Sequence, residues 1–183
     1  MFGLADILSL TLSFKGFKNV FYSSVTLQEY LLFALFLYYS IKTKNAKKAI
    51  LVLSLLFIAF LAVYTFTAKF VRIDSIPIGV ETILILIFSF YYLYEEMNNT
   101  SVLFLYNKYQ FWVVIAFMIY LSGCFFMYIF ANQLPQQMVN EYWFIIDIFL
   151  ILKNVLFSIA ILVFVLSRNE KTPPRIHQIK ALT

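Results

Sequence analysis

Long blocks of apolar residues, separated by short polar segments, dominate this chain. Four blocks are long, at residues 49–66 (extendable to 70), 76–94, 111–131 and 143–166. A helix needs about 20 mainly apolar residues to cross the roughly 30 Å hydrocarbon core of a bilayer. None of the blocks alternates between apolar and polar positions as the strands of a membrane barrel do. The pattern therefore predicts transmembrane helices.

A fifth block, residues 27–41, is shorter and rises only about 22 Å as a helix. It lengthens if the lysines of "KTKNAKK" reach out to the membrane surface, or if the helix begins as early as Val20. In "TLQE", Thr26 precedes Glu29 by three residues, which is the spacing of a capping box. This spacing predicts that the helix starts near Thr26 and that Glu29 serves its cap.

We therefore expect an all-α integral membrane helical bundle of about five transmembrane helices, covering residues 26–167. The predicted spans are about 26–42, 49–70, 76–94, 111–131 and 143–166. Residues 1–25 lack the basic start and the cleavage site of a signal peptide, so we predict an interfacial amino-terminal arm there. Residues 168–183 are predicted to form a polar cytoplasmic tail.

The amino-acid composition supports a membrane environment and excludes several kinds of functional site. The chain is 63% hydrophobic and 13% charged, whereas a soluble domain has about 25% charged residues. The single cysteine, Cys124, excludes a disulfide framework and a cysteine-built metal site, and the single histidine, His177, lies in a polar tail and is interpreted as solvated. No nucleophile, phosphate-loop or zinc-protease motif is present, and we predict no enzyme, metal or cofactor. A hydrolase built on Glu81 and Asp147 is the one enzymatic alternative left open.

Basic residues mark one side of the predicted bundle. Five spans place nine of them on the same side: Lys42, Lys44, Lys47, Lys48, Lys108, Arg168, Lys171, Arg175 and Lys180. The other side holds only Lys15, Lys18, Lys69 and Arg72. The positive-inside rule then predicts the amino terminus outside and the carboxyl terminus in the cytoplasm. No basic stripe suits nucleic acid, so the lipid bilayer is the predicted partner.

The last span carries polar residues at intramembrane depth. Asp147, Asn154 and Ser158 fall on one helical face as a stripe. Lys153 points roughly 100° away from Asn154 and lies about 15 Å below the outer end, near the bilayer centre. A central charge costs about 2.5–3.5 kcal/mol on insertion scales. We therefore expect Lys153 to face the bundle interior and to have a partner.

Glu81 on the third span is the preferred partner of Lys153, because it lies about 7 Å below the outer end of its span, a level that the lysine side chain can approach by leaning outward. Asp147 or Asn154 completes the expected network, although Asp147 lies six residues from Lys153, a poor spacing for direct pairing. Three interpretations stay open: structural glue between helices, which is favoured, then a ligand, ion or proton site, then a lateral interface.

Small residues in the middle of the fourth span indicate close helix packing. Ala116 and Gly123 are seven residues apart and share a face. Small side chains let two backbones approach each other in a membrane. Cys124 beside them is interpreted as a small hydrophobic residue.

Three stretches carry a resemblance to a family: "FYYLYEEM", "FLYNKYQFWVVIAFMIYLSGCFFMYIFA" and "YWFIIDIFLILKNVLFSIAIL". Over roughly residues 28–166 the chain resembles a group of small multi-pass inner-membrane proteins of Bacteroidota-type bacteria, often met beside sensor-kinase genes. The resemblance implies a bacterial inner-membrane location, a link to envelope sensing, and recurrence of Lys153 and Asn154. This chain is shorter at its amino end than the resemblance implies, which leaves open one or two further spans there.

The leading functional hypothesis is a non-enzymatic sensory or signalling component that contacts a membrane partner, such as a sensor kinase, through its helices. The alternative is a small ion or solute transporter or channel that uses Glu81, Lys153 and Asp147. The oligomeric state is left open.

Overall fold

The computed structural model describes residues 15–67, 75–98, 105–130 and 133–170 of the chain. Its helices are α2 (Lys15–Ser40), α3 (Lys44–Thr67), α4 (Ser75–Met97), the short 3-10 helix η1 (Leu105–Asn107), α5 (Tyr109–Phe130), α6 (Gln136–Tyr142) and α7 (Phe144–Glu170). The described residues contain no strand. The prediction of an all-α membrane bundle is confirmed.

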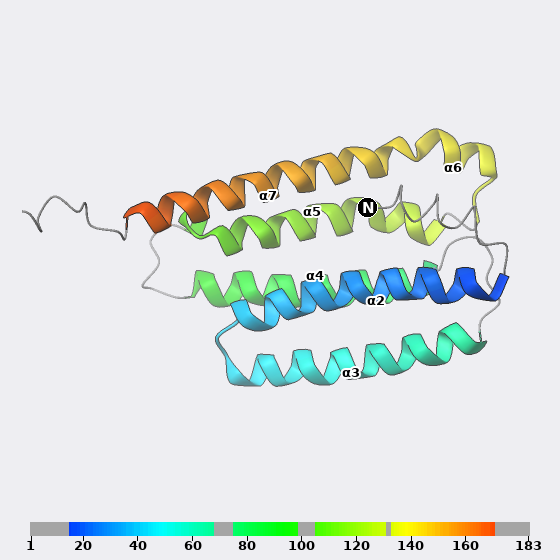
Figure 1. Ribbon diagram of the computed structural model, residues 1–183, viewed down its shortest axis with the longest axis horizontal. Coiled ribbons are helices and arrows are strands. Elements are labelled where there is room, and N and C mark those ends of the chain that lie inside the picture. The colour runs from blue at the N-terminus through cyan, green and yellow to red at the C-terminus, as the bar shows by residue number, and fades with distance from the viewer. Residues whose placement is uncertain (1–14, 68–74, 99–104, 131–132, 171–183) are drawn as a thin grey trace, which may run out of the picture.

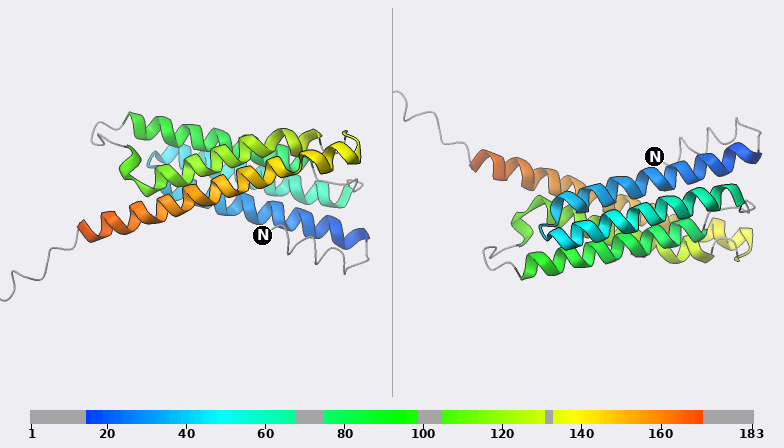
Figure 2. Two further views of the ribbon diagram at one scale, coloured as in Figure 1. Left: turned by 90° about the horizontal axis from the view of Figure 1, so that it is seen from above. Right: turned by 90° about the horizontal axis from the view of Figure 1, so that it is seen from below.

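Five long helices lie side by side along one direction, as Figures 1 and 2 show. Helix α4 is central and contacts α2, α3 and α5, whereas α7 packs mainly on α5 and forms an edge of the bundle. The α2–α3 turn and the carboxyl ends of α4 and α7 lie at the same end of the bundle (Figure 1). The basic residues Lys42 and Lys108 lie at this end, as the charge pattern requires.

Four stretches are long and apolar enough to cross a membrane: α3, α4, α5, and residues Gln137–Arg168, which join α6 to α7. Helix α2 is as long as these but more polar, and it lies in the same bundle beside α3 and α4. The protein is therefore a multi-pass membrane protein with four shown candidate spans. Membrane crossing by α2 stays a prediction.

The start of α2 differs from its predicted position. The helix begins at Lys15, so Thr26 and Glu29 lie in its middle and the expected capping role is wrong. Polar contacts explain the longer helix: Ser23 and Thr26 are buried, and the Thr65 hydroxyl of α3 donates a 3.0 Å hydrogen bond to Ser23. Residues 15–25 of the predicted arm are thus helical, and residues 1–14 lie outside the described residues.

Aromatic side chains fill the core between the helices. Tyr30 of α2 packs on Phe57 of α3 with ring centres 4.3 Å apart, and its hydroxyl shares a 2.9 Å hydrogen bond with Ser54. Phe33 of α2 meets Phe117 of α5 at 4.1 Å. Large apolar side chains also cover the outward faces of α3 and α7. Exposed apolar faces of this size are expected to contact the lipid tails of a membrane.

Two adjacent carboxylates fasten the basic end of the bundle. Glu95 of α4 accepts hydrogen bonds from the backbone N–H groups of Lys42 and Thr43, at 2.8 and 2.7 Å, just before α3 begins. These N–H groups have no partner within the helix, so a residue of another helix caps α3. Glu96 is buried and forms ion pairs with Lys42, at 2.8 Å, and with Lys108. Three segments thus meet at the end of α4.

Candidate functional site

Lys153 faces the interior of the bundle, where its ammonium meets an aromatic ring. The Nζ atom lies 3.7 Å from the ring centre of Tyr120, which is 2% exposed. A cation over an aromatic face is stabilised by about 0.5–2 kcal/mol, and most when both groups are away from water. The inward direction of Lys153 agrees with the sequence prediction. Its direct contact, however, is a ring of α5.

The expected ion pair between Lys153 and Glu81 is not formed in the part of the chain that the structure describes. Glu81 is 3% exposed, and its Oε1 atom has no hydrogen-bond partner. Glu29 of α2 interacts electrostatically with both Lys153 and Glu81. The carboxylate whose charge acts on the lysine is therefore Glu29, which sequence reasoning had assigned to a helix cap.

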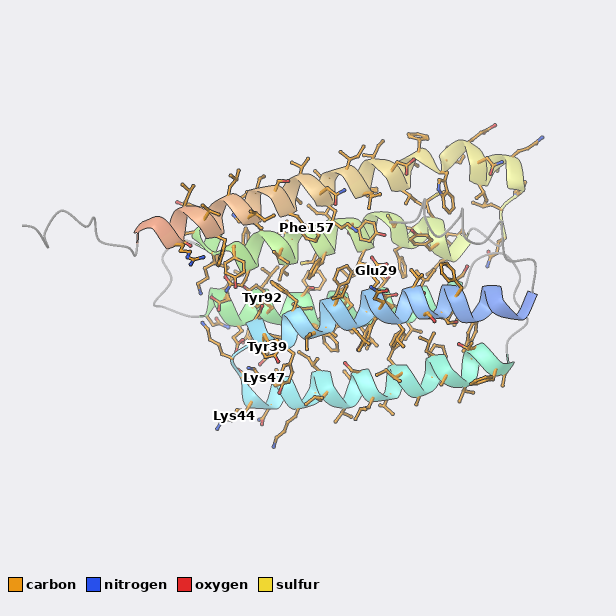
Figure 3. All side chains as sticks on the ribbon, viewed as in Figure 1. Glu29, Tyr39, Lys44, Lys47, Tyr92 and Phe157 are labelled. Carbon is orange, nitrogen blue, oxygen red and sulfur yellow. The ribbon has the colours of Figure 1, made fainter. Side chains whose placement is uncertain are left out.

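Helix α5 adds a line of polar atoms to this interior. Tyr120, Cys124 and Tyr128 follow each other at four-residue spacing, so they share one face, and all three are buried. Glu29 acts electrostatically on all three side chains, and the Tyr120 and Tyr128 side chains influence each other. Figure 3 shows Glu29 on the side of α2 that faces α5.

We call this group the interior cluster; it consists of Glu29, Glu81, Tyr120, Cys124, Tyr128 and Lys153. Four helices contribute to it: α2, α4, α5 and α7. Two carboxyl groups and one ammonium carry a net negative charge when all three are ionised. Such an imbalance is costly in a low-dielectric interior, and a proton or a cation removes it. The chemistry available to the cluster is therefore the exchange of a proton or the binding of a positive charge.

Asp147, Asn154 and Ser158 lie on an exposed face of the last helix, turned away from the interior cluster. All three are exposed, which corrects the expectation that Asp147 or Asn154 completes the network of Lys153. The buried face of α7 carries Ile146, Leu156 and Ala160 together with Lys153, and this face rests on α5. The polar stripe lies about 100° around the helix and points away from the bundle.

The outward polar residues belong to a regular seam along α7. Among the exposed side chains, one line has alternating spacings of four and three residues, and we call these positions the α7 seam: Asp147, Ile151, Asn154, Ser158, Ile161 and Val165. Other residues of the helix are exposed as well: Ile148, Leu152, Val155, Leu162 and Phe164. The Ser158 hydroxyl donates a 3.0 Å hydrogen bond to the Asn154 carbonyl of its own helix. The Asn154 side chain forms no hydrogen bond within residues 15–170 as far as they are described.

The α5–α7 contact is close at the predicted small residues. A Cβ atom added to Gly123 would come 2.4 Å from a ring carbon of Phe149, a separation that atoms do not tolerate. Ala116, two helical turns before Gly123 on α5, is fully buried. Glycine at position 123 thus makes room for an aromatic ring of α7, as small residues do in membrane bundles.

Comparison with protein-family models, with curated proteins and with solved structures finds no match for this chain. No group of His, Cys, Asp and Glu side chains suited to a metal ion occurs within the described ranges. Fold and site together define a multi-pass helical membrane protein that has an ionisable cluster inside and a polar seam on its outer edge.

Proposed function

We propose that this chain is a non-enzymatic sensory or signalling membrane component that acts through contact between α7 and a transmembrane helix of a partner. The single observation that carries the proposal is the exposed side chain of Asn154 in the middle of a 27-residue apolar helix. An amide without a hydrogen-bond partner in hydrocarbon costs several kcal/mol, and a neighbouring helix removes that cost.

The position of α7 supports this proposal. It is the edge helix of the bundle and the least buried of the four candidate spans. Many of its outward side chains are exposed among the described residues, and the polar ones, Asp147, Asn154 and Ser158, give that surface a preferred direction. The resemblance to proteins met beside sensor-kinase genes suggests a sensor kinase as the partner. We place the protein in a bacterial inner membrane with the basic end of the bundle in the cytoplasm.

A photo-crosslinking experiment in native membranes tests the proposal. A photoreactive amino acid replaces Ser158 on the seam or Leu152, which is 38% exposed and lies about 120° around the helix from Ser158. We expect a discrete protein adduct from position 158 and mainly lipid adducts from position 152. Equal protein capture at both positions, or none at either, would contradict a contact directed by the seam.

A second candidate function, a small ion or solute transporter, is favoured by the unpartnered Oε1 atom of buried Glu81. Glu29 and Lys153 lie in the same interior and supply charges that respond to a bound proton or cation. Proteoliposomes with a pH- or ion-sensitive dye measure the activity. Flux that is lost in Glu81→Gln and Lys153→Ala, but kept in Glu141→Gln at the exposed end, would support transport. Absence of flux from correctly oriented protein would remove this candidate.

A further inference from the structure

We infer that Glu81 is a proton-binding site inside the bundle: at neutral pH its carboxyl group is un-ionised, while Glu29 and Lys153 carry opposite charges. The inference goes beyond the lateral contact of α7, because it concerns the interior cluster and not the outer surface of the bundle. It assigns a ligand, a single proton, to one named residue. The burial of Glu81, an oxygen atom without a donor, and the charges of the neighbouring helices support this assignment.

Glu81 occupies a place where an ionised carboxylate is poorly solvated. It lies less than two turns inside α4, and only 3% of its surface is exposed. Its Oε1 atom has no hydrogen-bond partner among the described residues. An ionised carboxylate needs donors for its oxygen atoms, whereas the carbonyl oxygen of an un-ionised acid stays without a donor at much lower cost. The un-ionised form therefore fits this environment better.

The groups that face Glu81 from α2 and α5 favour the same form. Helix α2 presents Glu29, whose negative charge acts on Glu81, and Tyr30, on which Glu81 acts in turn. Helix α5 presents Tyr128, an uncharged side chain that is also under the influence of Glu81. The one full charge that acts on Glu81 from these two helices, as far as they are described, is thus negative. A second negative charge beside it is unfavourable in an apolar interior.

Helix α3, which also packs on α4, supplies no balancing charge. Its lysines are confined to its start, at the opposite end of the bundle from Glu81 (Figure 1). Its one tyrosine, Tyr64, packs on Phe60 of the same helix, with ring centres 5.9 Å apart. A proton on Glu81 itself is therefore the simplest way to remove the charge.

The ammonium of Lys153 is already engaged elsewhere. It lies over the ring of Tyr120, and Glu29 acts on it electrostatically. Within the described residues no ion pair joins Lys153 to Glu81. Because Glu29 and Lys153 cancel each other, one proton on Glu81 makes the interior cluster neutral, which is the least costly state in a low-dielectric region.

A proton fits this place better than a metal cation does. Hard metal cations take about six or more oxygen ligands at once. The described part of the chain holds no group of His, Cys, Asp and Glu side chains suited to a metal ion. A proton needs a single oxygen atom, and Glu81 supplies it.

Infrared spectroscopy of the full-length protein, in a detergent without ester groups, tests the inference without any measurement of flux. An un-ionised carboxylic acid has a carbonyl-stretch band that carboxylates and amides lack. We expect the wild type to show this band at neutral pH. Glu81→Gln should lose it and stay folded, because the amide has the shape and the neutrality of the acid. Glu141→Gln, at an exposed residue, is the matched control and should keep the band.

A second variant tests the charge balance of the cluster. Lys153→Met removes the positive charge that balances Glu29. Glu29 should then take up a proton as well, and the carboxylic-acid band should increase about twofold, because a buried acid without a counter-charge neutralises itself.

The pH dependence of unfolding gives an independent measurement. A folded protein that holds a proton which the unfolded chain releases becomes less stable as pH rises. The unfolded glutamate releases its proton below about pH 5. Above that pH, and as long as folded Glu81 keeps its proton, the unfolding equilibrium constant of the wild type should rise about tenfold per pH unit relative to Glu81→Gln.

Several results would overturn the inference. They are absence of the band in the wild type, survival of the band in Glu81→Gln, a Glu81→Gln protein that does not fold at neutral pH, an unchanged band in Lys153→Met, and equal pH dependence of unfolding in the wild type and Glu81→Gln. Loss of the band when sodium replaces potassium at constant pH would show that Glu81 binds a metal cation instead.

The failure of this inference is distinguishable from the failure of the proposed functions. None of these results bears on crosslinking at position 158, so the lateral contact of α7 stands or falls separately. A carboxylic-acid band that depends on Glu81, in a protein without flux, would keep the proton site and remove only the transport candidate.

Discussion

The ammonium of Lys153 sits 3.7 Å above the ring of Tyr120, so the deepest positive charge of the described spans is held by an aromatic face. A carboxylate of α2, Glu29, acts on the same ammonium electrostatically. The lysine thus joins α7 to α5 by direct contact and to α2 through its charge. Substitutions of the Tyr120 ring and of the Glu29 carboxylate are therefore expected to change stability in different ways.

The contact between ring and ammonium is testable by a double-mutant cycle. We combine Lys153→Met with Tyr120→Leu and measure the free energy of unfolding in mild detergent. The two substitutions should couple by about 0.5–2 kcal/mol, because each one alone already removes the interaction. Tyr120→Phe keeps the ring and should couple to Lys153→Met far less. Additive effects of Lys153→Met and Tyr120→Leu would show that the contact contributes nothing.

Loss of the lysine charge is expected to strand a negative charge in the bundle. Lys153→Met should lower the thermal unfolding midpoint in detergent, and Leu152→Met, one residue away on the exposed side, should not. Adding Glu29→Gln to Lys153→Met should restore most of the loss, because Glu29 is the carboxylate that acts on the lysine. Restoration by Glu81→Gln alone would instead identify Glu81 as the partner that the sequence first suggested.

The cost of a charge near the bilayer centre predicted the inward direction of Lys153 but not its partner. Positions 100° apart on a helix are known from the sequence, and so Lys153 and Asn154 were correctly separated. Which of the two faces meets the bundle depends on the apolar residues that pack on α5, here Ile146, Leu156 and Ala160. Apolar residues occur all around α7 and suit either lipid or core, and the sequence prediction therefore placed Asp147 and Asn154 on the wrong side.

Glu29 shows a different limit of sequence reasoning. Its capping-box spacing with Thr26 is a local pattern, whereas the start of α2 is set by contacts with α3, such as the hydrogen bond between Thr65 and Ser23. Glu95 and Glu96 gave no signal beyond the end of an apolar block. Their roles depend on Lys42 and Lys108, which the fold brings to them from other segments. The long spans, by contrast, follow from hydrophobic length alone.

The glycine of α5 is expected to be intolerant of even a methyl group. Gly123→Ala should destabilise the protein by about 1–3 kcal/mol, because the new Cβ would overlap the ring of Phe149. Ser122→Ala is the matched control: this side chain is exposed, and its hydroxyl bonds only to carbonyls of its own helix. Phe149→Leu should relieve part of the loss in Gly123→Ala. Unfolding measured by a thermal shift in detergent decides between these outcomes.

The carboxylates at the end of α4 yield the last prediction, which concerns the connection of three segments. Glu96→Gln should destabilise the bundle by about 1–3 kcal/mol, because Glu96 is buried between Lys42 and Lys108 and its loss leaves two ammonium groups facing each other. Glu95→Gln should cost about 0.5–2 kcal/mol, since an amide oxygen still accepts a hydrogen bond but without the charge that favours the start of α3. Glu141→Gln, exposed at the other end, is the control.

Limited proteolysis of membrane vesicles adds a local measurement, in which Glu96→Gln should expose the α2–α3 turn to cleavage before the whole bundle unfolds. Cleavage of that turn at the wild-type rate would show that other contacts, and not Glu96, hold it against α4.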